Sequence, residues 1–128
     1  MPQREGRKAV KEPCEPMRDQ ILSMKWEADW DGEGAKPITE SVRRAAIRFG
    51  EGICQESLRA PDSIAPSTRG AIGFTWRTRS DQFNVQVSSS RKNGCLVRRA
   101  GSSGRLSRQC SIPEALQELT SFLAPERG

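Results

Sequence analysis

The chain has 128 residues, of which 34% are hydrophobic and 29% are charged, and its formal net charge is +5. This length suits a single domain with a thin core, and no apolar run reaches the roughly 18 residues that a membrane span requires. Residues 1–16 also lack the apolar stretch of a secretory signal. We therefore expect one cytoplasmic domain that does not enter a membrane.

The two ends of the chain are more polar than its middle. Residues 1–15 carry four basic side chains and few apolar ones, which is typical of a disordered basic arm. We interpret this arm as a solvated tail, and a nucleic-acid-binding arm remains the alternative. Residues 16–124 are predicted to form the domain, and residues 125–128 a short tail.

Two helices are predicted in the first half of the chain. A first helix should begin at Pro16 and continue until Gly32, Gly34 and Pro37 end it. Thr39 is a suitable N-cap for a second helix, which Gly50 and Gly52 weaken near its end. The first helix presents the apolar stripe Met17, Ile21, Met24 and Ala28, and the second presents Val42, Ala45, Ala46, Phe49 and Ile53.

From Ala71 the helical spacing gives way to alternation, which predicts strands. A loop over residues 61–66 precedes two strands near residues 71–77 and 82–87, and Asn93-Gly94 is a hairpin signal before a third strand at residues 95–100. A fourth strand follows at residues 105–110. Ser111 and Glu114 then form a capping box for a closing helix that Pro125 should end.

This order predicts an α+β fold with two N-terminal helices, a four-stranded antiparallel meander and one C-terminal helix. Helices should cover one face of the sheet and leave the other face exposed to water. On the exposed face we expect Thr75, Arg77, Gln82, Asn84 and Gln86, with Arg98 or Arg99 and with Arg105 or Gln109, because the strand registers are open.

The positive charge is concentrated in the strand region. Residues 69–108 contain nine basic residues and one acid, Asp81, which gives this segment a net charge of +8. Because the whole chain carries only +5, the rest of it is net negative. Such a concentration can attract anions or an acidic partner, and a basic sheet that is merely solvated is the alternative.

The cysteines and histidines argue against a zinc site. The chain has no His, and its four cysteines lie far apart in the sequence. We expect four free thiols, two of them small core residues, and disulfides of unassigned pairing remain a minor alternative. The core thiols should be Cys54 and Cys110, and the others are Cys14 and Cys95.

Two stretches carry a resemblance to known proteins. Residues 30–37 read WDGEGAKP, and residues 70–76 read GAIGFTW. Over residues 17–90 the chain resembles a set of small uncharacterised bacterial proteins with the signature W-D-G-x-G-A-x-P, a helix and then G-x-I-x-[LF]-x-W on a strand. Members look like mobile-element or phage cargo. The resemblance implies a partner-directed inhibitor, such as an antitoxin, immunity or anti-defence protein, and it implies no catalytic activity.

Residues 29–40 read DWDGEGAKPITE and approach the pattern of an EF-hand calcium loop. Acids stand at loop positions 1, 3, 5 and 12 and glycine at position 6, but the residues at positions 5, 8 and 9 do not fit, and a second loop is missing. We interpret the stretch as a turn between two helices. A weak metal site remains a minor alternative, with candidate ligands Asp29, Asp31, Glu33 and Glu40.

Catalysis is poorly supported by the residue types. Without His the chain lacks the commonest general base, and it contains neither a P-loop nor a G-x-G-x-x-G motif. We therefore expect a protein that is not an enzyme and needs no cofactor. The predicted function is stoichiometric occupation of an acidic protein or nucleoprotein partner.

Direct electrostatic nucleic-acid binding by the same surface is the alternative function. Phe74, Trp76 and Phe83 alternate onto the core side, so rings for base stacking are missing from the exposed face. The predicted binding residues, on the sheet and on a hairpin that contains Lys92, are Arg77, Arg79, Arg91, Lys92, Arg98, Arg99, Arg105 and Arg108.

Overall fold

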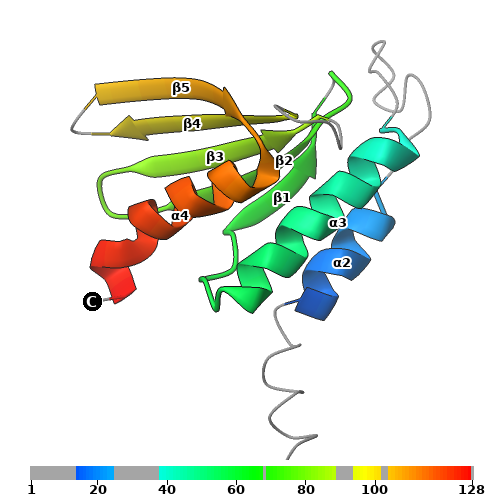
Figure 1. Cartoon of the computed structure of the whole chain (residues 1–128), viewed down its shortest axis with the longest axis horizontal. Helices are drawn as coiled ribbons and strands as arrows, with labels where there is room; N and C mark the ends of the chain where they lie inside the picture. The colour runs from blue at the N-terminus through cyan, green and yellow to red at the C-terminus, as the bar shows by residue number, and fades with distance from the viewer. Residues whose placement is uncertain (1–13, 25–37, 68, 89–93, 102–103, 128) are drawn as a thin grey trace, which may run out of the picture.

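The computed structural model describes residues 14–24, 38–67, 69–88, 94–101 and 104–127 (Figure 1). The described part is an α+β domain with three helices and a five-stranded antiparallel sheet in the order β1-β2-β3-β4-β5, which confirms the predicted class. The elements are α2 (Cys14–Leu22), α3 (Glu40–Gln55), β1 (Ser63–Pro66), β2 (Ile72–Arg77), β3 (Gln82–Val87), β4 (Cys95–Gly101), β5 (Gly104–Cys110) and α4 (Ile112–Arg127).

The second predicted helix, α3, forms as its sequence indicates. The side chain of Thr39 caps it by accepting a hydrogen bond from the Val42 N–H at 3.2 Å. Its apolar stripe is buried, with Phe49 at the centre. Gly52 serves packing, because a Cβ at this position would lie 2.5 Å from Cδ1 of Leu116 on α4. The glycine therefore allows α4 to approach α3.

The first predicted helix is shorter than expected. α2 begins at Cys14 and ends at Leu22, whereas the sequence predicted a helix from Pro16 that Gly32 would end. Its buried contacts are made by Met17 and Ile21. The part of the predicted helix that follows Met24, and all of the predicted arm that precedes Cys14, lie outside the described residues.

β1 corrects the prediction of a loop at residues 61–66. Ile64 is its one buried residue, so the alternation that marks a longer strand is missing. Pairing with β2 stabilises it, and just before it the Asp62 N–H donates to the Thr75 carbonyl at 2.7 Å. Pro66 is tolerated because β1 is an edge strand of the described sheet and a proline there need not cost a ladder hydrogen bond.

The core lies between the sheet and the helices. Phe74 and Trp76 of β2 meet Phe49 of α3, with ring centroids 4.9 and 6.2 Å from that of Phe49. The buried indole of Trp76 is not left unpaired, because its N–H donates to the Arg59 carbonyl at 2.8 Å. These contacts fix the side of β2 that faces inward.

The closing helix α4 starts with the predicted capping box. The Ser111 N–H donates to the Glu114 carboxylate at 2.8 Å, and the Glu114 N–H donates to the Ser111 hydroxyl at 3.3 Å. The helix continues to Arg127, so the prediction that Pro125 would end it was wrong. A proline this close to the C-terminal end removes one N–H donor, and buried Phe122 and Leu123 hold the preceding turn in place.

All of the described helix packing is on one side of the sheet. α3 contacts β2 and β3, and α4 contacts β3 and β4 (Figure 1). Among the described residues no helix covers the other side. We call this uncovered side the open face.

The cysteines differ in state. Cys95 and Cys110 are free, buried and directly opposite each other on β4 and β5. Cys54 is also buried, but it is disulfide-bonded, which corrects the expectation of four free thiols.

Within the described residues, no helix is both long and apolar enough to span a membrane.

Candidate functional site

The strand registers determine which side chains share the open face. Because side chains alternate along each strand, every residue on this face lies opposite another one on the next strand. Three rows of opposed residues cross the sheet: Arg77, Gln82, Ala100 and Arg105; Ser63, Thr75, Asn84, Arg98 and Ser107; and Ala65, Gly73, Gln86, Leu96 and Gln109.

The five residues that the sequence placed firmly on this face all lie there. The open alternatives are also resolved. Arg98, rather than Arg99, lies on the open face, because Val97 and Cys95 point into the core. Arg105 and Gln109 both lie there, since they are four residues apart on one strand.

Hydrogen bonds hold the centre of the open face in place. The Asn84 amide group donates to the Thr75 hydroxyl at 2.9 Å and to the Phe74 carbonyl at 3.2 Å. The Gln86 amide donates in turn to Asn84 Oδ1 at 2.9 Å. Gln86 lies across Gly73, where a Cβ would come within 2.6 Å of its Nε2. The amides therefore form a row that is ordered before any partner binds.

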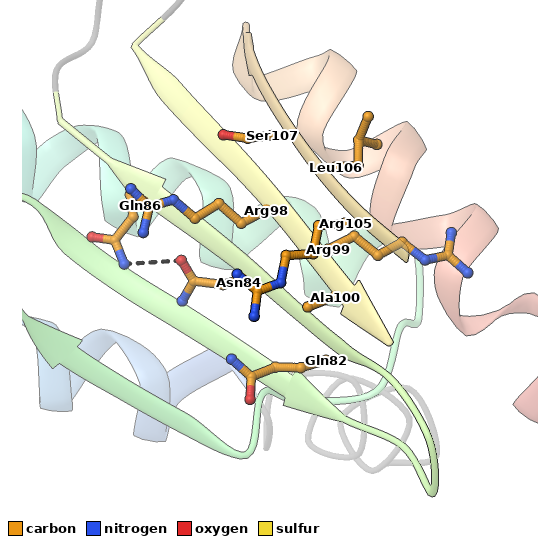
Figure 2. Close-up of a pocket in the computed structure, with 9 residues that line it drawn as sticks. All are labelled: Gln82, Asn84, Gln86, Arg98, Arg99, Ala100, Arg105, Leu106 and Ser107. Atoms are coloured by element: carbon orange, nitrogen blue, oxygen red, sulfur yellow. Dashed lines mark hydrogen bonds between the residues drawn. The ribbon is translucent and has the colours of Figure 1, made fainter. Parts of the chain in front are cut away.

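An open hollow of about 710 Å³ lies beside this row (Figure 2). Residues from three neighbouring strands line it, and none of them is acidic. The lining residues are Gln82, Asn84, Gln86, Arg98, Arg99, Ala100, Arg105, Leu106 and Ser107.

Two of the predicted binding arginines lie on the helix side instead. The guanidinium of Arg99 is 3.7 Å from the Asp81 carboxylate and lies over the Phe122 ring, 5.0 Å from its centroid. Arg108 forms an ion pair with Glu118 of α4. These two charges are neutralised within the fold, so they are poor candidates for binding a partner.

The other predicted basic residues are dispersed. Arg77 is exposed on the open face, and its Nε donates to the Gln82 side chain at 3.4 Å. Arg79 is exposed between β2 and β3. Arg91 and Lys92 lie outside the described residues, so the structure does not place the predicted hairpin tip.

Most of the weak metal candidates cannot be placed either. Asp29, Asp31 and Glu33 lie outside the described residues. Glu40 is placed at the start of α3 and pairs with Arg44 at 3.6 Å. Among the residues that the structure describes, no three His, Cys, Asp or Glu side chains come together to hold a metal ion.

The charge of the open face depends on which arginines lie on it and which lie on the helix side. Its described residues include Arg77, Arg98 and Arg105 but no acid. Asp81, the one acid of residues 69–108, pairs with Arg99. The open face is therefore a positive surface with ordered amides between its arginines.

The two free thiols add no reactive group near neutral pH. Burial raises the pKa of Cys95 to about 12, and neighbouring Cys110 contributes to this shift. Burial also raises the pKa of Cys110. Both therefore stay protonated, whereas nucleophilic attack requires the thiolate.

Three residues that line the hollow were not found from the sequence: Ala100, Leu106 and Ser107. The side chain of Ser107 lies on the open face, whereas that of Leu106 projects from the other side of β5 (Figure 2). The alternation of residues 105–110 could have placed Ser107 beside Arg105. The Asp81–Arg99 pair carries no sequence signal, because it joins the turn between β2 and β3 to β4 through the fold.

The fold and the open face define an α+β domain with helices on one side of an antiparallel sheet and a basic surface on the other. No protein-family model, curated protein or solved structure matches this chain.

Proposed function

We propose that this chain is a non-enzymatic cytoplasmic binding protein that occupies an acidic protein or nucleoprotein partner in a fixed stoichiometry. Its role is that of an antitoxin, immunity or anti-defence protein, as the resemblance implies. The observation that carries the proposal is the charge of the open face, where the guanidinium groups of Arg98 and Arg105 form no ion pair among the described residues while Arg99 and Arg108 are paired on the other side. Arg77 lies on the same face, with its backbone N–H bonded to the Asp62 carboxylate.

Arginines in this arrangement suit carboxylate groups. A guanidinium binds a carboxylate through two parallel N–H groups, and such charge-assisted bonds are the stronger ones. Arg98 and Arg105 lie on neighbouring strands, which are spaced about 5 Å apart. Together they can engage neighbouring acids on one partner surface. The ordered amides of Asn84 and Gln86 lower the entropy cost of forming that contact.

The aromatic residues favour a protein partner over single-stranded nucleic acid. Phe74, Trp76 and Phe83 are buried in the core, and no aromatic side chain lies on the open face among the described residues. Base stacking supplies much of the affinity of single-strand binders. The remaining nucleic-acid alternative is salt-sensitive contact with duplex phosphates.

A comparison of two charge-matched variants tests the proposal. Arg98→Glu/Arg105→Glu reverses the open face, and Arg44→Glu/Arg48→Glu makes the same change in net charge on the exposed side of α3. The probes are polyglutamate, duplex DNA and single-stranded RNA at about 50 and about 200 mM salt. We expect polyglutamate to bind the wild type and the α3 variant alike and the open-face variant about tenfold or more weakly.

The same titration distinguishes the two functions. The wild type could bind duplex DNA more tightly than polyglutamate and lose this binding in the open-face variant. That result would show that the partner is nucleic acid rather than an acidic protein. Equal effects of the two variants would show that only net charge matters and would contradict the proposal.

A further inference from the structure

The two edges of the described sheet differ in how they are protected. β1 has four residues and ends in Pro66, both of which discourage pairing with another strand. β5 has seven residues, and those from Gly104 to Gln109 are all exposed. Among the described residues no strand pairs with its outer side. β5 is therefore the edge at which another strand can add.

The register shows which backbone groups of β5 point outward. Gly101 and Gly104 form the last pair of β4 and β5 and are separated by two residues, so this pair must exchange hydrogen bonds with each other. Hydrogen-bonded and non-bonded pairs then alternate along an antiparallel ladder. It follows that Arg105, Ser107 and Gln109 direct their backbone N–H and C=O groups away from β4. A strand added here has three N–H donors and three carbonyl acceptors to bond.

The side chains along this edge are different on the two faces. Arg105, Ser107 and Gln109 lie on the open face, whereas Leu106 and Arg108 lie on the helix side. Leu106 is 47% exposed, so a large apolar side chain is accessible on the helix side of this edge. Arg108 is already paired with Glu118. The edge thus offers a positive charge on one face and an apolar contact on the other.

Charge complementarity argues against a second copy of β5 as the occupant. Two copies paired antiparallel about Ser107 would place Leu106 opposite Arg108 and Arg105 opposite Gln109 of the other copy. In that register Arg105 meets no carboxylate and Leu106 meets no apolar side chain. A strand that alternates acidic and apolar side chains satisfies Arg105 and Leu106 together.

We propose that β5 takes up an extended segment of the acidic partner as a sixth, antiparallel strand, with acidic side chains beside Arg105 and an apolar side chain against Leu106. The inference rests on the proposed function, because it names how that partner docks. Backbone hydrogen bonds supply affinity in this mode, and the alternating side chains supply specificity.

The probe is an N-acetylated, C-amidated heptapeptide of alternating glutamate and valine with glutamate at both ends. Ser107→Pro removes the outward N–H of Ser107 without removing a bond to β4, so an edge strand tolerates it. Ser107→Ala keeps that N–H and is the matched control. We expect the proline variant to bind the peptide about tenfold or more weakly and the alanine variant within about twofold of the wild type.

A second arm leaves the protein unchanged and so does not depend on the folding of a variant. In antiparallel addition the peptide residues that bond to Arg105, Ser107 and Gln109 have their side chains on the open face and are therefore the glutamates. Methylating the glutamate backbone nitrogens should abolish binding to the wild type, whereas methylating the valine nitrogens should not. Amide shifts of residues 105, 107 and 109 in nitrogen-15 spectra should move on binding.

The outcomes separate strand addition from the proposed function. In one outcome both methylated peptides bind like the parent peptide, Ser107→Pro has no effect, and Arg98→Glu/Arg105→Glu abolishes binding. Strand addition is then overturned, and the proposed function stands. If no acidic probe binds, the proposed function fails and strand addition with it. A dimer of the free wild type that Ser107→Pro dissociates would assign this edge to a second copy and overturn the inference.

Discussion

The guanidinium of Arg99 lies over the ring of Phe122, 5.0 Å from its centroid, where β4 meets α4. The preceding residue, Arg98, projects to the opposite side of the same strand, onto the open face. Two adjacent arginines therefore have different roles. One joins the sheet to the closing helix, and the other belongs to the surface that we propose for the partner.

Substitution of these two arginines should separate stability from binding. Arg99→Ala removes the contact with Phe122 and leaves Asp81 without its partner, so we expect the free energy of unfolding to fall by about 1 kcal/mol. Arg98→Ala should change it by less than about 0.5 kcal/mol, as is usual for an exposed position. Urea denaturation measures both. A larger loss for Arg98→Ala would contradict this division.

The glycines of α3 provide a second matched pair. A Cβ at Gly50 would meet only Met17 Sδ, at 3.9 Å, so Gly50→Ala should stabilise the helix by about 0.5 kcal/mol or more. At Gly52 the same Cβ would overlap Leu116, and overpacking typically costs about 1–3 kcal/mol. Gly52→Ala should therefore be the less stable protein by thermal denaturation. In a Leu116→Ala background this cost should disappear, and its persistence would show that Leu116 is not the cause.

The raised pKa of Cys95 predicts that the protein loses stability at alkaline pH. Folding raises the pKa of Cys95 from its ordinary value of 9.0 to about 12, so the folded state keeps a proton that the unfolded chain releases. This contribution is fully present below about pH 9 and declines as the pH rises toward 12. Urea midpoints between about pH 8 and about pH 10.5 should fall less in Cys95→Ala than in the wild type. Equal decreases of the urea midpoint with pH in the wild type and in Cys95→Ala would contradict this prediction.

The amide row on the open face should contribute to both stability and binding. Asn84→Ala removes two donated bonds and the acceptor that holds Gln86, so we expect it to cost about 1–2 kcal/mol. Gln82→Ala loses one exposed contact of 3.4 Å to Arg77 and should cost little. Polyglutamate affinity measured beside urea denaturation should fall for Asn84→Ala. An unchanged affinity would show that the order of this row is irrelevant to binding.

The main strands could be predicted because their burial is one-sided. Phe83, Val85 and Val87 alternate with polar residues, and that period directly encodes which side is buried. β1 could not be predicted in the same way, because Ile64 is its single buried residue and its position depends on pairing with β2. Local pattern therefore succeeds for strands that carry their own apolar face and fails for a short edge strand.

The candidate site was predictable in composition and not in geometry. The sequence located the positive segment, but a shift of one residue exchanges Arg98 and Arg99 between the two faces. The register that decides between them depends on the pairing of Val85 with Val97. Neutralisation of Arg108 by Glu118 joins β5 to α4 and has no local signature. Contacts between elements thus determine which of the predicted basic residues lie on the open face.

The most direct measurement of the central claim is quantitative capture from a nuclease-treated bacterial lysate with three baits. The baits are the wild type, Arg98→Glu/Arg105→Glu and the charge-matched Arg44→Glu/Arg48→Glu. Native mass spectrometry then measures the stoichiometry of each eluted complex. We predict an acidic protein or nucleoprotein in a fixed ratio to the wild type and to the α3 variant, and its loss from the open-face variant. Equal retention of that partner by all three baits would contradict the account.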